Sequence, residues 1–129
     1  MPTIRRFEDL EAWQKARDLV RILYAETTDG PFARDFVLRD QARRSAVSIM
    51  ANVAEGFERD GNKEFQQFLS MAKGSCGELR SHLYVALDQK YVDAQQHEDL
   101  LNRALEISRL IAGLIRYIRQ SQHRGRKYA

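Results

Sequence analysis

Hydrophobic residues recur at steps of three and four along four stretches of the chain, which is the spacing of one face of an α-helix. These stretches predict helices over residues 8 to 27, 33 to 57, 63 to 89 and 93 to 120. The apolar stripes of the first two helices consist of Phe7, Leu10, Trp13, Ala16, Val20 and Leu23, then Leu38, Ala42, Ala46, Ile49 and Val53. Those of the last two consist of Phe65, Phe68, Leu69, Ala72, Cys76, Leu79, Leu83 and Leu87, then Leu100, Leu101, Ala104, Ile107, Ile111, Leu114, Ile115 and Ile118. No strand-like alternation interrupts this pattern, so the fold class is all-α.

Turn-forming residues separate the four predicted helices. The first break is the run from Thr27 to Pro31, and the second is Asp60 to Asn62, where the Asn62 side chain is suited to cap the next helix. Before the last helix, Asp93 and Gln96 have the spacing of a capping box. Such short connections favour antiparallel neighbours. We therefore expect an antiparallel up-down-up-down four-helix bundle over residues 1–120 and a basic flexible tail over residues 121–129.

A polar stripe runs beside the apolar stripe of the second predicted helix. Its members, also three and four residues apart, are Gln41, Ser45, Ser48, Asn52 and Glu55. Serine and asparagine lower helix propensity, so their repetition indicates hydrogen bonds to another helix that approaches closely. Ser75 and Glu78 on the third helix are the expected partners, and we predict that Asn52 and Glu55 are largely buried. The alternative is that the serines are only small residues that permit tight packing.

Two further residues of the third predicted helix are informative. An interior glycine such as Gly74 costs roughly 1 kcal/mol relative to alanine, so its presence indicates that another backbone comes close. The alternative is a tolerated weak position. Cys76 is the only cysteine and lies on the apolar stripe. A small buried side chain is therefore favoured over a reactive thiol.

Composition places the chain among single-domain globular proteins. It has 129 residues, of which 43% are hydrophobic and 30% are charged. No apolar run approaches the roughly 20 residues that cross a bilayer, and the first residues lack the apolar core of a secretory signal. We expect a cytoplasmic protein without a membrane partner.

The positive charge is concentrated at the carboxyl end. The formal net charge is only +3, yet no acidic residue follows Glu106. A cluster of arginines also opens the second helix, where Asp35 and Asp40 are spaced to pair with Arg39 and Arg44. Arg43 has no such acidic partner nearby. The candidate phosphate-binding residues are Arg39, Arg43, Arg44, Arg116, Arg119, Arg124, Arg126 and Lys127. The alternative is that they form solvated surface and a solvated tail.

Enzymatic chemistry has little support in the sequence. Glu78 and His82 are four residues apart and could share a metal ion, although a chance pair is the simpler interpretation. Walker, nucleophile-elbow, Cys-x-x-Cys and His-Glu-x-x-His motifs do not occur. We therefore expect a protein that is not an enzyme and has no catalytic residues, cofactor or metal.

Three motifs resemble a known bacterial family. They are Gln41 with Ser48-Ile-Met-Ala-Asn-Val-Ala-Glu-Gly-Phe57, then Glu64-Phe-x-x-Phe-Leu69, and Ala72-Lys-Gly-Ser-Cys-Gly-Glu-Leu79. The resemblance, over about residues 5 to 120, is to the four-helix-bundle proteins encoded in intervening sequences of bacterial large-subunit ribosomal RNA genes. The accessory variability protein of diversity-generating retroelements is similar. Family members usually have proline where this chain has Met50, so a kink in the second helix is not expected on that ground.

The resemblance implies a homopentameric ring and a role with nucleic acid. It also implies a possible protein partner, because the retroelement relative binds both nucleic acid and its reverse transcriptase. Large apolar residues beyond a narrow seam, Trp13, Phe57 and Tyr84, independently favour a homo-oligomer, with a dimer as the alternative to the pentamer. Two hypotheses follow: a non-enzymatic oligomeric protein that binds RNA or DNA through phosphate contacts, or a protein adaptor such as a reverse transcriptase accessory subunit.

Overall fold

The computed structural model describes residues 4–121, which consist almost entirely of helix. The elements are a 3₁₀ turn η1 (Phe7–Asp9), the helices α1 (Glu11–Glu26) and α2 (Gly30–Arg34), and the three long helices α3 (Phe36–Glu58), α4 (Asn62–Asp88) and α5 (Ala94–Ser121). The all-α class predicted from the sequence is therefore confirmed. The predicted tail over residues 121–129 lies outside the described residues except for Ser121, which still belongs to α5.

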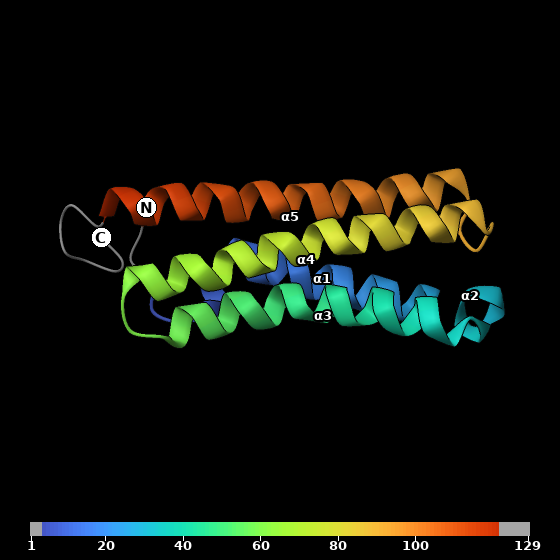
Figure 1. Cartoon of the computed structure of the whole chain (residues 1–129), viewed down its shortest axis with the longest axis horizontal. Helices are drawn as coiled ribbons and strands as arrows, with labels where there is room; N and C mark the ends of the chain where they lie inside the picture. Colours follow the sequence, from blue (N-terminus) through green and yellow to red (C-terminus); the bar gives the residue numbers. More distant parts are fainter. Residues whose placement is uncertain (1–3, 122–129) are drawn as a thin grey trace.

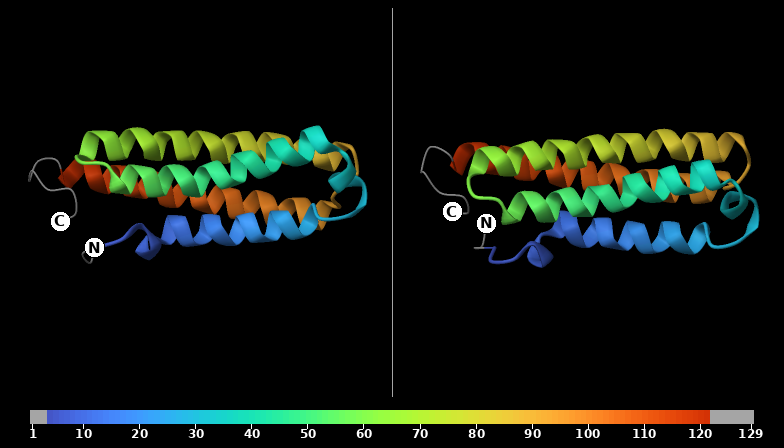
Figure 2. Two further views of the ribbon diagram at one scale, coloured as in Figure 1. Left: turned by 90° about the horizontal axis from the view of Figure 1, so that it is seen from below. Right: turned by 60° about the horizontal axis from the view of Figure 1, so that its bottom comes forward.

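The four main helices run in alternating directions. Figure 1 shows α1 and α4 running one way and α3 and α5 running back, with α2 at the end of the bundle where α1 gives way to α3. Each helix packs against two neighbours, so that α1 lies between α3 and α5, and α4 lies between the same two helices (Figure 2). This is the predicted antiparallel up-down-up-down bundle.

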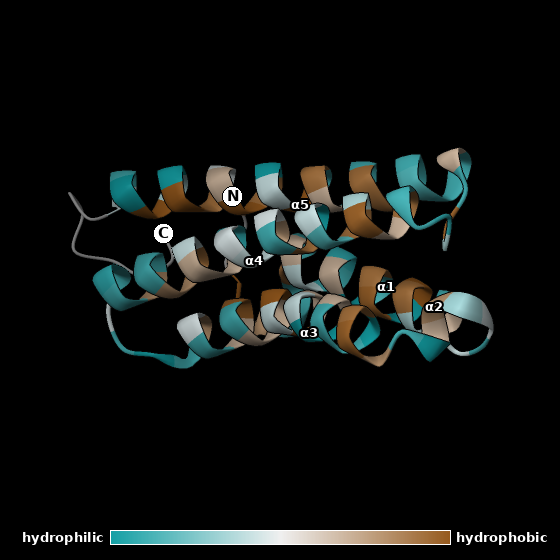
Figure 3. Cartoon of the chain, turned by 45° about the vertical axis from the view of Figure 1, so that its right-hand side comes forward, coloured by the Kyte–Doolittle hydropathy of each residue, from teal (hydrophilic) through white to brown (hydrophobic). Residues whose placement is uncertain are grey.

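The predicted apolar stripes form the core between these helices. Residues such as Leu23, Ile49, Leu79 and Ile111 have at most 1% of their surface exposed. Figure 3 shows the result as hydrophobic ribbon segments on the sides of the helices that face one another. Burying each such side chain stabilises the fold by about 1.5–3 kcal/mol relative to leaving it in water. The periodicity of the sequence thus located most of the core, although Ala12, Leu19 and Phe32 are also buried and lie outside the predicted stripes.

The amino-terminal boundary differs from the prediction. We expected helix from residue 8, but η1 ends at Asp9 and Leu10 has an extended conformation (ψ 126°), so that α1 begins at Glu11. At this break the Phe7 ring packs edge-on against Trp13, with 5.2 Å between the ring centroids. The interruption also allows the Leu10 side chain to turn into the core, where it is 3% exposed.

A second difference is the interruption near the start of the second predicted helix. The helix expected from residue 33 is divided at Asp35, which separates the short α2 from α3. The Asp35 carboxylate accepts a hydrogen bond from the Leu38 N–H (3.1 Å) and another from the Tyr91 hydroxyl (2.9 Å). The Tyr91 ring also stacks on buried Phe32 of α2, with 5.6 Å between the centroids. The break therefore lets α2 cover one end of the core.

The start of α5 was predicted correctly, whereas the start of α4 was not. The capping box before α5 is confirmed, because the Asp93 N–H donates to Gln96 Oε1 (2.9 Å) and the Gln96 N–H donates to Asp93 Oδ1 (2.7 Å). At α4 the prediction was wrong by one residue. Gly61 occupies the N-cap position with a φ of +95°, a conformation that glycine adopts without strain, and Asn62 is the first helical residue.

Close backbone approach occurs at a different glycine from the one we predicted. Gly74 lies on an exposed face of α4, and a Cβ atom added there would meet nothing within 4 Å. Gly56 near the end of α3 is the tightly packed glycine, because a Cβ atom there would lie 2.7 Å from Cβ of Phe68. The prediction for Gly74 was wrong because helix spacing alone does not show which face meets a neighbour.

Candidate nucleic-acid interface

The five described arginines proposed to bind phosphate lie at two opposite ends of the bundle. Arg39, Arg43 and Arg44 belong to the first turns of α3, whereas Arg116 and Arg119 belong to the last turns of α5 (Figure 1). At about 1.5 Å per residue, α5 is roughly 40 Å long, so one protomer does not present these groups side by side. The other three candidates, Arg124, Arg126 and Lys127, lie outside the described residues.

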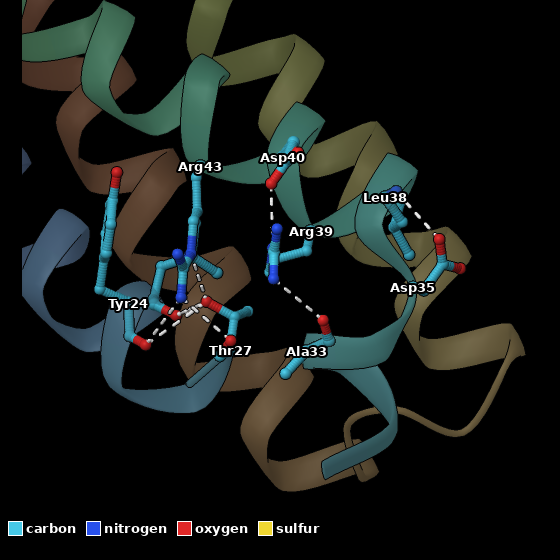
Figure 4. A network of polar contacts seen from close by, with 9 residues as sticks. Tyr24, Thr27, Ala33, Asp35, Leu38, Arg39, Asp40 and Arg43 are labelled. Carbon is cyan, nitrogen blue, oxygen red and sulfur yellow. Dashed lines mark hydrogen bonds and ion pairs between the residues drawn. The ribbon is translucent and has the colours of Figure 1, made fainter. Parts of the chain in front are cut away.

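Arg39 is engaged with its own surroundings. Its Nε donates to Asp40 Oδ1 (2.9 Å), and its Nη1 donates to the carbonyl oxygen of Ala33 (3.1 Å). The guanidinium also lies over the Phe36 ring, 4.9 Å from its centroid. Figure 4 shows Arg39 directed toward the α2–α3 junction. The expected pairing partner for Asp40 was Arg44, but the observed ion pair joins it to Arg39.

Arg43 makes a network of contacts with the end of α1. Its Nε donates to Thr27 Oγ1 (2.8 Å) and its Nη2 donates to the Thr27 carbonyl oxygen (3.0 Å), while the guanidinium lies 4.2 Å from the Tyr24 ring centroid (Figure 4). The last carbonyls of a helix have no partner within it, and a cation satisfies them well. Arg43 therefore joins α1 to α3, whereas neighbouring Arg44 has an exposed side chain.

The other basic cluster lines a groove between α4 and α5. The groove has a volume of about 430 Å³ and is lined by Ser70, Lys73, Ala112, Ile115, Arg116 and Arg119. Arg119 Nε donates to Gln66 Oε1 across the groove (3.1 Å). This bond uses one of the five N–H groups of the guanidinium. The groove thus brings together two predicted residues and one that we had not predicted, Lys73.

Among the described residues, no carboxylate lines this groove. Of the nearest acidic residues along α4, Glu64 pairs with Arg59 (3.6 Å), and the Glu78 carboxylate lies 3.7 Å from Nε2 of His82. Successive residues of a helix are 100° apart, which places Glu64 and Glu78 on the α3 side of α4 and Lys73 on the α5 side. The cations of the groove consequently add their potentials without a neighbouring negative side chain, which is the electrostatic character of an anion site.

Lys73 could be assigned to this cluster only once the register of the two antiparallel helices was known from the structure. The Gln66–Arg119 bond fixes their register, so residues of α4 and α5 whose numbers sum to 185 lie at the same level. Lys73 then lies level with Ala112, one turn from Arg116. Charge counting along the chain missed this cluster because it treated each helix separately.

The polar stripe of α3 is partly as predicted. Ser75 Oγ of α4 donates to Ser48 Oγ of α3 (3.0 Å), so a hydrogen bond does cross between these helices. Asn52 is partly buried, but its Nδ2 bonds Ser48 on the same helix, at 2.9 Å to the carbonyl oxygen and 3.0 Å to Oγ. The tight packing that small residues permit and the hydrogen bond across the helices therefore occur together.

The prediction of a buried Glu55 was wrong. Its side chain is 52% exposed and pairs with Arg59 four residues later (2.9 Å). Glu78 is also exposed, at 56%. Both positions follow the three-and-four spacing but lie farther from the line where the two helices meet. A carboxylate there stays in contact with water and can form a surface ion pair, which costs less free energy than burying it between the helices.

Cys76 is buried, as expected. Burial raises the pKa of its thiol to about 11, so the reactive thiolate is scarce at neutral pH.

An apolar pocket of about 170 Å³ lies between α1 and α5, lined mainly by Leu10, Ala12, Leu110, Leu114 and Tyr117. Within residues 4–121, no three His, Cys, Asp or Glu side chains gather where they could hold a metal ion. Among the described helices, none has the length and apolar character required to cross a membrane.

The fold is shared with a solved bacterial structure. That protein, from Bacteroides thetaiotaomicron, is described as a protein of unknown function from the S23 ribosomal protein family. It superimposes with a TM-score of 0.74 over 81% of this chain and 97% of its own chain, at 23% sequence identity. At this identity the likeness concerns the fold alone. A comparison with curated proteins gives no match.

The model of one protein family matches most of the sequence. It is that of the 23S rRNA-intervening sequence protein, and the match covers residues 8–113, from the start of the bundle to the last third of α5. This range includes the Ser48 and Ser75 motifs whose side chains meet between α3 and α4. The chain therefore belongs to the 23S rRNA-intervening sequence protein family.

Proposed function

We propose that this chain is a non-enzymatic, oligomeric nucleic-acid-binding protein of the cytoplasm that contacts the phosphates of RNA. The observation that carries the proposal is the groove in which Lys73, Arg116 and Arg119 lie together, with no carboxylate among its described lining residues. A phosphodiester strand is a line of negative charges, and lysine and arginine contacts to it release condensed counterions. Arg124, Arg126 and Lys127 follow α5 in the sequence and add three positive charges to the same end of the chain.

Our proposal assigns fewer arginines to this function than the sequence suggested. The hydrogen bonds of Arg43 to Thr27 and those of Arg39 to Ala33 and Asp40 give these two residues roles within the bundle. Using them for phosphate would require breaking such contacts. We therefore centre the proposal on the α4–α5 groove, and assign Arg44 at most a secondary role at the other end.

Assembly is part of the proposal. Large apolar side chains remain exposed on one protomer, namely Tyr24, Phe36, Val37, Val47, Met71, Tyr84 and Val85. Of the three residues on which the sequence argument rested, Phe57 is buried, Trp13 is half-buried and Tyr84 stays exposed. A ring of five protomers is the arrangement that the family resemblance implies, and a dimer is the alternative. Either would repeat the basic groove and multiply its phosphate contacts.

A titration of labelled single-stranded RNA at low salt tests the proposal. The variant replaces Lys73, Arg116 and Arg119 with glutamine, and the matched control replaces Arg17, Arg21 and Arg34, which are exposed residues of α1 and α2. Both triple variants lose the same charge. We expect binding by the wild type and the control and a loss of at least about tenfold in the groove variant. No binding by the wild type at micromolar protein overturns the proposal.

A protein adaptor is the second candidate. It is favoured by Phe36 and Val37, which are 63% and 76% exposed at the α2–α3 corner. Adjacent apolar residues with this exposure are suited to bind a partner protein, such as the reverse transcriptase that the resemblance implies. The genes beside this one would indicate the setting, since a neighbouring reverse transcriptase gene favours the adaptor and a surrounding ribosomal RNA gene favours the RNA role.

A further inference from the structure

Tyr84 is an exposed aromatic residue on the same side of α4 as the basic groove. In one protomer, 49% of the Tyr84 surface is exposed. Residues at steps of four and three share a face of a helix, and Tyr84 continues the row that contains the groove residues of α4. The full row is Gln66, Ser70, Lys73, Gly77, Arg80 and Tyr84. The aromatic ring and the cations are thus parts of one surface.

The Tyr84 ring rests on a buried partner. Its centroid lies 4.7 Å from that of His97 in the first turns of α5, and the two ring planes are inclined at 56°. His97 itself is only 6% exposed. A ring supported in this way keeps a fixed position with part of its surface in water. A second flat ring can therefore stack on it without first displacing protein atoms.

The surface of α4 between the groove and Tyr84 is basic and has few protruding side chains. Lys73 and Tyr84 are eleven residues apart, which corresponds to roughly 16 Å along the helix. Between them Gly77 has no side chain, and the Arg80 guanidinium lies back toward it, with Nη2 3.7 Å from the position a Cβ atom would occupy. At about 3.4 Å per stacked nucleotide, the path spans roughly five nucleotides.

We propose that Tyr84 is a stacking platform for an unpaired base, and that the ligand of this face is single-stranded nucleic acid. This inference rests on the proposed function, because the groove must first hold the phosphates. A strand whose backbone lies on Lys73, Arg116 and Arg119 then places a base on the Tyr84 ring. Bases inside a duplex are stacked on both faces and cannot reach it. Stacking accepts any base, so the face selects single strands without selecting sequence.

The experiment compares one RNA strand alone with the same strand annealed to its complement. The variants are Tyr84→Ala, Tyr84→Leu, which keeps apolar bulk, and Tyr84→Phe, which keeps the aromatic ring. We expect Tyr84→Ala and Tyr84→Leu to weaken single-strand binding at least about fivefold and to leave duplex binding within about twofold. Tyr84→Phe should bind like the wild type. The salt dependence of single-strand binding should stay unchanged, since no phosphate contact is lost.

Several results would overturn the inference. Equal loss of single-strand and duplex binding, or recovery by leucine as complete as by phenylalanine, would show that an aromatic ring is not required. A fall in particle mass by light scattering would make Tyr84 part of an interface between copies. If the groove variant loses RNA binding but Tyr84→Ala does not, only the stacking inference fails. If the wild type binds no RNA, the proposed function fails with it.

Discussion

At the scale of single residues, neighbouring arginines with the same charge have different structural roles: one bonds to another helix and the other is exposed. Arg43 and Arg44 are adjacent in the sequence, but one helical step of 100° turns Arg43 toward the end of α1 and leaves Arg44 in solvent. The sequence correctly indicated that Arg43 lacks a nearby acidic partner. It gave no sign that backbone carbonyls would take that place, because Thr27 lies 16 residues away in the chain.

This contrast gives a prediction for stability. Arg43→Ala removes charge-assisted hydrogen bonds to Thr27 and the contact with the Tyr24 ring, so the free energy of unfolding should fall by about 2 kcal/mol. Arg44→Ala should change it by no more than about 0.5 kcal/mol. Urea denaturation of the two variants provides the measurement. Equal stabilities would show that Arg43 does not join α1 to α3.

Glu26 supplies a second prediction, concerning pH. Its pKa is raised, first by partial burial and then by the charges of Asp99 and Asp93, while Arg103 acts in the opposite direction. One of its carboxylate oxygens, Oε2, is buried without a hydrogen-bond partner among the described residues. Folding therefore favours the protonated form, and this stabilisation is present below the ordinary glutamate range and lost as pH rises through the raised pKa.

Glu26→Gln imitates the protonated carboxyl and tests this sign directly. The melting temperature of the variant should exceed that of the wild type at about pH 7, and the difference should shrink as the pH falls below the ordinary glutamate range. Melting followed by circular dichroism at both pH values measures it. A variant that is less stable at neutral pH would mean that the ionised carboxylate contributes favourably after all.

At the scale of elements, the sequence determined which segments are helical but not where each helix is interrupted. The stripes of α4 and α5 and the Asp93–Gln96 capping box were recognised because their signals lie within about seven residues. The break at Asp35 was missed although Asp35 caps α3 locally, because its second partner is distant: the Tyr91 hydroxyl that donates to it lies 56 residues away. The break at Leu10 was missed because the apolar stripe continues through it without a turn-forming residue.

The two contrasting glycines make a test at this scale. In Gly56→Ala the new methyl group would clash with Phe68, so we expect destabilisation by about 1–3 kcal/mol. In Gly74→Ala the methyl group enters open space in the middle of α4, and the better helix propensity should stabilise one protomer by up to about 1 kcal/mol. Denaturant titrations of both variants measure the effects, and a destabilised Gly74→Ala would indicate that another copy packs there.

At the scale of the whole molecule, the candidate site depends on how two helices are paired. The carboxyl-terminal charge was visible in the sequence, but the contribution of Lys73 required the register in which Gln66 faces Arg119. Because α3 and α5 run in the same direction, the arginines at the start of α3 lie at the opposite end of the bundle from this cluster. Two of them, Arg39 and Arg43, are also engaged in contacts within the bundle.

Assembly is a prediction about the particle as a whole. One protomer has a mass of 15.0 kDa, and its exposed apolar residues include Phe36 and Val37. We expect light scattering at micromolar concentration to give a multiple of this mass, five under the family arrangement. Replacing Phe36 and Val37 with serine should leave the mass unchanged if they bind a different protein, and lower it if they join copies. A particle of 15.0 kDa for the wild type would contradict the oligomer.

The salt dependence of RNA binding tests the central claim most directly. If Lys73, Arg116 and Arg119 contact phosphates, the logarithm of the wild-type association constant should fall linearly with the logarithm of salt concentration, by roughly 0.7 per contact on a single strand. Replacing the three residues with glutamine should reduce that slope by about 2 per protomer bound, whereas the Arg17, Arg21 and Arg34 control should keep it. Parallel lines for the wild type and the groove variant would contradict the assignment of the α4–α5 groove as the phosphate site.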